Sequence, residues 1–220
     1  MNKYGLALHT TSPSLGLALD NFAGDDRHQT WDLGHELGNQ LHRKLIEMIA
    51  PQTWQDLSFL AVAIGPGSFT GTRLGVVTAR TLAQQLDLPL VGISSFATFA
   101  WWWVSQNSSN SLESGQILAL QSPAQRDRLF VGIYQVTNNR QNPLQTLLSD
   151  TVMTPPDWQE KLLGLNFSLQ SPAIALEVPQ NLGLTATSLL DLAYRYKSQD
   201  GHEFPWSAVL PFYGQHPVDN

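Results

Sequence analysis

Short apolar runs with the length of β-strands recur along this chain, and two pairs of them share one layout. Tyr4–His9 and Leu15–Asp20 form the first pair, with a Ser- and Pro-containing turn between them, which predicts a β-hairpin. Ile117–Gln121 and Leu129–Val136 repeat this layout about half a chain length later. The repetition predicts two related lobes that each begin with a hairpin, unless the similarity of such short runs is chance.

Helical spacing of leucine predicts two helices between the hairpins. The first covers Asp32–Ile49, where an apolar residue recurs at every fourth position, and Pro51 ends it. The second covers Thr72–Leu86, and a strand over Leu88–Ile93 follows. In the second half of the chain we expect a helix over Pro155–Leu163, a strand over Ala173–Leu176 and a helix over Thr185–Lys197.

A polar segment over 105–115 is the best candidate for a boundary, because serine, asparagine and glutamine dominate it. We therefore expect an N-terminal lobe over 1–104 and a C-terminal lobe over 105–220, with the last helix packing back on the first lobe. Strands and helices alternate in each half, which predicts an α/β fold.

Composition narrows the classes of protein further. A hydrophobic fraction of 42% is enough for a packed core. A net charge of -6 with scattered Lys and Arg argues against a chain that makes the main electrostatic contact with nucleic acid. Because cysteine is absent, disulfides and thiolate chemistry are excluded. Neither a signal peptide nor an apolar stretch of the ~18 residues that span a bilayer is present, so we expect a cytoplasmic protein.

The most informative stretch is the glycine-rich loop Gly65–Gly71, which joins an apolar β run directly to an amphipathic helix. This arrangement places backbone N–H groups at a helix N-terminus, where an anion can bind. The loop lacks the lysine of a P-loop and the third glycine of the dinucleotide fingerprint. A structural turn, with Ser68, Thr70 or Thr72 as helix cap, is therefore the competing interpretation. The candidate anion site comprises Gly65, Gly67, Ser68, Thr70 and Gly71.

Small residues at four-residue spacing mark one face of each predicted helix. Glycine inside a helix costs about 1 kcal/mol relative to alanine, and close approach of another element is the usual compensation. That element is either the chain's own sheet or a helix of a partner. Arg73, in the first turn of the second predicted helix, is disfavoured there by the helix dipole and is expected to reach an anion or a partner. The candidate partner interface comprises Gly34, Gly38, Arg73, Gly75, Ala79 and Ala83.

Catalytic and metal-binding patterns do not occur in the sequence. His35 and His42 are two helical turns apart, too far for one ion, and neither HExxH nor GxSxG is present. We therefore predict no catalytic residue, no metal site and no cofactor. Three adjacent tryptophans, Trp101–Trp103, cannot all face one core from a helix. One or two are expected at an interface or under the polar segment, and burial of all three between the lobes is the alternative.

The run from Gly65 to Gly75, followed by Pro89–Ser95, closely resembles the TsaB (formerly YeaZ) family of bacterial tRNA threonylcarbamoyladenosine biosynthesis subunits. With the first helix and hairpin, the resemblance covers about residues 4–100. In the second half only Pro211–Tyr213 is similar to the family's C-terminal Pro-x-Tyr. The resemblance implies a duplicated two-lobe α/β fold of the actin/Hsp70/sugar-kinase (ASKHA) type.

The resemblance also implies a function. TsaB proteins resemble the catalytic subunit TsaD but lack its metal-binding histidine pair, as does this chain. They pair with TsaD through helices of the N-terminal lobe and with the ATPase TsaE, and the complex transfers threonylcarbamoyl to the N6 atom of an adenosine in tRNA. This chain is therefore expected to be a non-catalytic subunit that contacts tRNA only through the complex. It is not expected to be a membrane protein. In the absence of TsaD, it is expected to form a homodimer through the same helices.

Two positions depart from the family pattern. His9 and Pro123 stand where family members carry an aspartate, and neither side chain supplies the hard oxygen ligand that magnesium prefers. Binding of a magnesium nucleotide between the lobes is therefore less expected. The alternative function is an active ATPase or phosphotransferase that uses the Gly65–Gly71 loop. A peptidase, an old label for the wider family, has no candidate nucleophile–base pair here.

Overall fold

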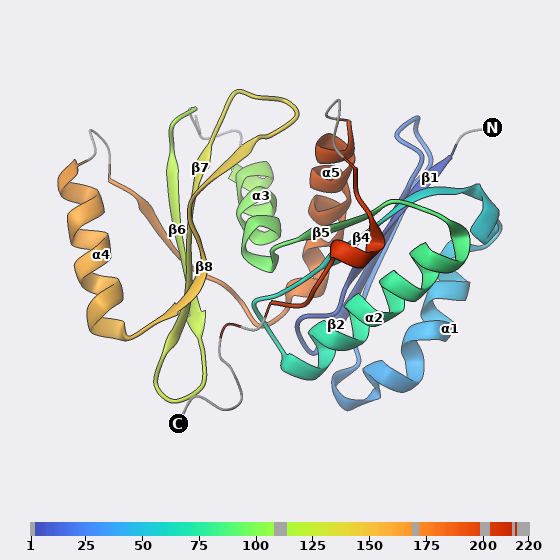
Figure 1. The fold of residues 1–220 in the computed structure, drawn as a ribbon, viewed down its shortest axis with the longest axis horizontal. Coiled ribbons are helices and arrows are strands. Elements are labelled where there is room, and N and C mark those ends of the chain that lie inside the picture. Colours follow the sequence, from blue (N-terminus) through green and yellow to red (C-terminus); the bar gives the residue numbers. More distant parts are fainter. Residues whose placement is uncertain (1–2, 108–113, 169–171, 199–202, 213, 215–220) are drawn as a thin grey trace.

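The computed structural model describes residues 3–107, 114–168, 172–198, 203–212 and 214 (Figure 1). Its strands form two sheets that share one four-strand topology, and the first sheet has β5 as an additional edge strand. The first sheet has the order β3-β2-β1-β4-β5 and the second has the order β8-β7-β6-β9. The strands of the first sheet are β1 (Tyr4–His9), β2 (Ser14–Asp20), β3 (Asp26–Asp32), β4 (Leu57–Ala63) and β5 (Leu90–Ile93). Those of the second are β6 (Ile117–Pro123), β7 (Leu129–Val136), β8 (Leu144–Met153) and β9 (Ile174–Glu177).

Each sheet begins with a three-stranded antiparallel meander, and a helix then leads to a strand parallel to the first strand of the meander. In the first lobe, α1 (Leu37–Ile49) connects the meander to β4, which pairs with β1. In the second lobe, α4 (Pro155–Ser168) connects the meander to β9, which pairs with β6. This repeat confirms the predicted duplication and the two-lobe ASKHA-type fold.

The helices separate the two sheets and cover their outer faces (Figure 1). α1 and α2 (Phe69–Leu86) cover the outer face of the first sheet, and α4 covers that of the second. α3 (Ser95–Asn107) and α5 (Ala186–Lys197) lie between the sheets, and α5 packs on strands of the first sheet. The division near residue 104 stays a prediction, since 108–113 lie outside the described residues. Short 3-10 helices cover Gly34–Glu36, Trp54–Asp56, Leu182–Thr185 and Trp206–Ala208.

Two strands and two helix starts differ from the expectation from sequence. The strands β3 and β8 were not predicted, because both are edge strands with many exposed positions and therefore lack a clear alternation. The expected helix over 32–49 begins only at Leu37, because Asp32 still belongs to β3 and Gly34 adopts a positive φ of 50°. The helix expected from Thr72 begins at Phe69, with Ser68 as its N-cap.

The three tryptophans lie on α3 and are half-buried against the core between the sheets. Trp101 Nε1 donates a hydrogen bond of 2.7 Å to Asp191 Oδ2 on α5, and the guanidinium of Arg195 lies 5.4 Å from the Trp101 ring. Trp101 thus connects α3 to α5 in the space between the lobes. In the part of the chain that is described, no helix is long and apolar enough to cross a membrane.

The small-residue face of α2 packs on the chain's own first sheet, one of the two neighbours that the spacing allowed, and contact of these residues with a partner stays a prediction. Ala79 and Ala83 are fully buried, and a Cβ added at Gly75 would lie 2.0 Å from Thr10 Oγ1. The three residues therefore allow α2 to approach the end of β1 closely. No matching stripe exists on α1, because Gly34 precedes the helix, and Gly38 is exposed with nothing within 4 Å of an added Cβ.

These two glycines make a matched test of the packing. We expect Gly75→Ala to lower the free energy of unfolding by about 1–3 kcal/mol, because the new methyl group overlaps Thr10. Gly38→Ala should be neutral or raise it by up to about 1 kcal/mol, because alanine is the better helix former and has room there. Urea denaturation of both variants measures the difference, and equal effects would contradict the close approach of α2.

Candidate functional site: the cleft between the lobes and the outer face of α2

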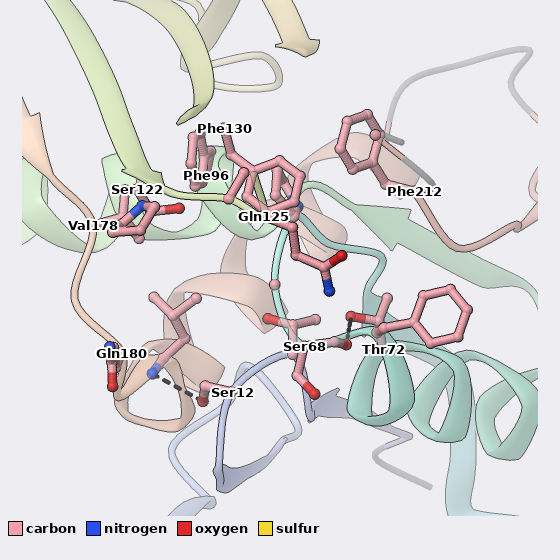
Figure 2. Close-up of a pocket in the computed structure, with 18 of the residues that line it drawn as sticks. Ser12, Ser68, Thr72, Phe96, Ser122, Gln125, Phe130, Val178, Gln180 and Phe212 are labelled. Atoms are coloured by element: carbon pink, nitrogen blue, oxygen red, sulfur yellow. Dashed lines mark hydrogen bonds between the residues drawn. The ribbon is translucent and has the colours of Figure 1, made fainter. Parts of the chain in front are cut away.

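A cleft of about 760 Å³ lies where the two lobes meet (Figure 2). Its walls come from the β1–β2 turn at 11–13, the loop 66–68 before α2, the β6–β7 turn at 122–126 and the segment 178–180 after β9. The fold duplication relates the first of these walls to the third and the second to the fourth. Equivalent connections of the two lobes therefore face each other across the cleft.

The cleft is lined by aromatic rings, prolines and neutral polar groups. Figure 2 shows the Gln125 side chain reaching from the second lobe toward Ser68 and Thr72 of the first. Among the described lining residues there is no aspartate or glutamate, and Arg126 is the one charged side chain. Magnesium needs hard oxygen ligands, usually carboxylates, so these residues do not fit a magnesium nucleotide. The labelled aromatic side chains are Phe96, Phe130 and Phe212, and the labelled hydroxyl and amide groups belong to Ser12, Ser68, Thr72, Ser122, Gln125 and Gln180.

The glycine-rich loop is closed onto the β1–β2 turn. Ser68 N donates a hydrogen bond of 2.7 Å to Thr11 O, and Thr10 Oγ1 donates one of 2.8 Å to Gly71 O. Gly71 N donates to the Ser68 hydroxyl oxygen at 3.3 Å, which caps α2. Two N–H groups of the candidate anion site, those of Ser68 and Gly71, thus already have acceptors within the chain. Anion binding here stays a prediction, and the contacts favour a structural role for the loop.

His9 lies at the end of β1 and is fully buried. Its Nδ1 is 3.5 Å from Thr11 Oγ1, and its Nε2 has no hydrogen-bond partner among the described residues. Burial lowers the pKa of His9 to about 3, because the imidazolium would lose its hydration. His9, which stands where the resemblance led us to expect an aspartate, is therefore a neutral core side chain. It offers no carboxylate that could orient a magnesium–phosphate group.

The outward face of α2 presents apolar surface to solvent. Phe69 is 50% exposed and also lines the cleft, and Val77, two turns further along, is 61% exposed. Between them Arg73 is exposed, and its guanidinium lies 3.7 Å from the centre of the Phe69 ring. On the neighbouring helix α1, Ile46 is 60% exposed. Arg73 lies in the second turn of α2, so the helix dipole bears on it less than the sequence suggested.

A polar cluster at the second lobe was missed by sequence reasoning. Asp150 on β8 accepts hydrogen bonds from Ser94 Oγ and, at 2.5 Å, from Tyr134 OH. Burial raises the pKa of Asp150 to about 6, although the hydrogen bonds from Ser94 and Tyr134 act to lower it. The only available signal was a lone acidic residue in an otherwise uncharged segment, and the strand itself was not predicted.

Comparison of the sequence with known families gives matches over less than half of the chain. A family model described as TsaD, tRNA N6-adenosine threonylcarbamoyltransferase, matches residues 42–138. A protein of Bacillus subtilis named tRNA threonylcarbamoyladenosine biosynthesis protein TsaB is 36% identical over 108 residues, 49% of this chain and 42% of that protein. The TsaB protein of Haemophilus influenzae is 34% identical over 102 residues, 43% of this chain and 41% of that protein. Over these aligned segments the chain is similar to TsaB proteins.

The aligned segments span less than half the length of these TsaB relatives, 42% and 41%. A solved structure of YeaZ from Pseudomonas aeruginosa superposes on 96% of this chain and 99% of its own, with a TM-score of 0.72 and 20% identity. A structure from the same organism, described as similar to peptidase YEAZ, covers 97% and 100% with a TM-score of 0.71 and 19% identity. The similarity to these two solved structures is one of fold, and it extends over both lobes.

The buried imidazole gives a pH prediction. We expect His9 to stay neutral in the folded protein as the pH is lowered to about 5, because its pKa of about 3 lies below the unfolded value of 6.5. The neutral form therefore contributes stability that is complete above pH 6.5 and is lost as the pH falls toward 3. An NMR titration of the His9 ring nitrogens checks this directly.

Site-specific NMR is preferable to a stability curve because Asp150 acts in the opposite sense. Its pKa is raised from 3.8 to about 6, so its stabilising effect is complete below 3.8 and is lost as the pH rises through 6. The two slopes offset each other over an overlapping range. Protonation of His9 near its ordinary pKa, with the fold intact, would contradict the burial described here.

Proposed function

We propose that this chain is an accessory subunit in the biosynthesis of threonylcarbamoyladenosine in tRNA, and that it supports a TsaD-type transferase through the outer face of α1 and α2. The observation that carries the proposal is the exposed apolar stripe of Phe69 and Val77 on α2, together with the exposed Ile46 on the neighbouring helix α1. The names of the TsaB relatives support the pathway, and the match to a TsaD model supports an assembly that contains such a transferase.

Chemistry at the outer face suits a protein partner. Large apolar side chains that project from rigid helices supply the anchors of interfaces, and Arg73 adds a cation stacked on the Phe69 ring. The partner contacts expected at Gly34 and Gly38 remain compatible with this surface, because both are exposed. The effect on the partner surface is indirect for Gly75, Ala79 and Ala83. Their close packing within the chain fixes the position of α2, which carries the apolar stripe.

The other partners follow from the same proposal. A TsaE-type ATPase joins the assembly, and the chain contacts tRNA only as part of that assembly. The isolated chain forms a homodimer through the same helices. In this assignment the chain itself carries no catalytic residue. The alternative, an ATPase or phosphotransferase that uses the Gly65–Gly71 loop, has less support. The described cleft residues offer no carboxylate for magnesium, and the loop's N–H groups at Ser68 and Gly71 are already engaged.

A charged side chain placed in the apolar stripe of α2 tests the partner surface. We expect Val77→Asp to weaken binding of the TsaD-type transferase from the same organism by roughly 30-fold or more, because a charge would be buried at an apolar contact. Leu163→Asp is the matched control, since Leu163 is 72% exposed on α4, at the far side of the second lobe (Figure 1). It should leave the affinity within about twofold.

Titration calorimetry of the purified chains measures both affinities, and circular dichroism checks that each variant is folded. Equal binding by wild type and Val77→Asp would place the interface elsewhere. No binding by the folded wild-type chain would overturn the proposed function itself.

A further inference from the structure

A buried hydrogen-bonded cluster joins the second lobe to the start of α3. Asp150 extends from β8 and accepts from Ser94 Oγ and Tyr134 OH, and these two hydroxyl oxygens are 3.1 Å apart. Ser94 is the residue before α3, and its hydroxyl oxygen also accepts from Phe96 N at 3.0 Å and Ala97 N at 3.1 Å. One serine hydroxyl therefore caps α3 and binds the carboxylate of Asp150.

From this cap the contacts continue into the first lobe. Ser95 N donates a hydrogen bond of 2.8 Å to Gly65 O, the first residue of the glycine-rich loop. Ser95 Oγ lies 2.9 Å from Thr11 Oγ1, and Thr11 O accepts from Ser68 N. Ser68 is the N-cap of α2. A series of hydrogen bonds, joined through the backbone at Ser94–Ser95 and within Thr11, thus runs from β8 of the second lobe to the first turn of α2.

The protonation state of Asp150 decides how Ser94 is used. An ionised carboxylate only accepts, so Ser94 donates to it and keeps its lone pairs for the N–H groups of α3. A protonated carboxyl carries one O–H donor and keeps one acceptor oxygen. A proton on Oδ2 makes Ser94 accept from Asp150 in competition with Phe96 N and Ala97 N. A proton on Oδ1 makes Tyr134 accept instead, and the tyrosine proton then has the Ser94 hydroxyl oxygen, 3.1 Å away, as its acceptor. Protonation of Asp150 is therefore expected to weaken the N-cap of α3 and the hydrogen bond from Ser95 N to Gly65 O of the glycine-rich loop.

We propose that Asp150 is a positioning residue for α2. Its charge determines the hydrogen bonds of Ser94 and, through Ser95 and Thr11, the position of the loop that precedes α2, the helix proposed to face the partner. The link to a partner rests on the proposed function. The link from Asp150 to the loop belongs to the isolated chain and is independent of it.

The neighbouring titratable groups leave Asp150 as the one that changes charge in the cluster near neutral pH. Burial raises the pKa of Asp150 to about 6. β7 contributes Tyr134, whose pKa burial and the Asp150 charge raise well above its usual value. α5 contributes Tyr196, whose pKa burial raises to about 12, and α3 contributes Ser94, which does not titrate in this range. Both tyrosines therefore stay protonated while Asp150 gains or loses its proton.

Hydrogen exchange of the isolated full chain at about pH 5 and pH 7.5, corrected for intrinsic exchange rates, tests the coupling. In the wild type we expect the amides of 65–72 and 95–98 to be less protected at the lower pH by roughly threefold or more. Asp150→Asn keeps the shape but cannot ionise, so this difference should disappear. Asp157→Asn, the same substitution at an exposed position in the first turn of α4, is the control and should behave as wild type.

Ser94→Ala breaks the series at its second residue and keeps the proposal testable if Asp150→Asn does not fold. It should remove the pH effect in 65–72 while Asp150 still titrates, which NMR of the Asp150 carboxyl carbon can follow. A pH effect in 65–72 that persists in either folded variant would overturn the coupling. So would its absence from the wild type.

Binding of the TsaD-type transferase adds the functional readout. Wild-type affinity should fall between about pH 7.5 and pH 5 by roughly threefold more than that of Asp150→Asn, which lacks the switch. Equal pH profiles for the two chains would show that the coupling does not reach the partner surface. If neither chain binds the transferase, the proposed function fails, whereas the exchange experiment still decides whether Asp150 positions the loop.

Discussion

The contact between the β1–β2 turn and the first turns of α2 sets the geometry on which the rest of the first lobe depends. Thr10 is fully buried, donates to Gly71 O and lies against the bare Cα of Gly75. Thr11 accepts from Ser68 N. Side chains larger than hydrogen at 71 or 75 would separate these elements, because an added Cβ would lie 2.2 Å or 2.0 Å from atoms of Thr10. The helix is thus held by its small residues, and its larger ones face outward.

This contact also explains why the glycine-rich loop suits docking better than nucleotide chemistry. The loop N–H groups of Ser68 and Gly71 are used within the chain, and the cleft above them is lined by rings, prolines and neutral polar groups. At the end of β1, where the resemblance led us to expect a carboxylate, His9 is buried and neutral. A rigid helix with Phe69 and Val77 exposed remains as the feature that a partner could recognise.

Sequence patterns predicted what depends on local periodicity and strong turn signals. Both hairpins, α4, α5 and the duplicated two-lobe fold follow from such signals. The edge strands β3 and β8 do not, because exposed strands lack alternation, and the start of α1 does not, because Gly34 adopts a positive φ that spacing cannot reveal. Spacing found the small face of α2 but could not say which neighbour it approaches. The cluster of Asp150, Tyr134 and Ser94 depends on contacts between residues far apart in the chain, which a single sequence does not encode visibly.

In the proposed function the outer face of α1 and α2 binds a protein partner, and the cleft does not bind a magnesium nucleotide. Hydrogen exchange of the full chain, measured with its TsaD-type transferase and separately with magnesium and ATP, distinguishes these two binding surfaces. The account predicts protection by the transferase around Ile46 and over 69–77, and no change in 122–126 or 178–180 with magnesium and ATP. Strong protection of those cleft segments by magnesium and ATP alone, without protection of α1 and α2 by the transferase, would contradict it.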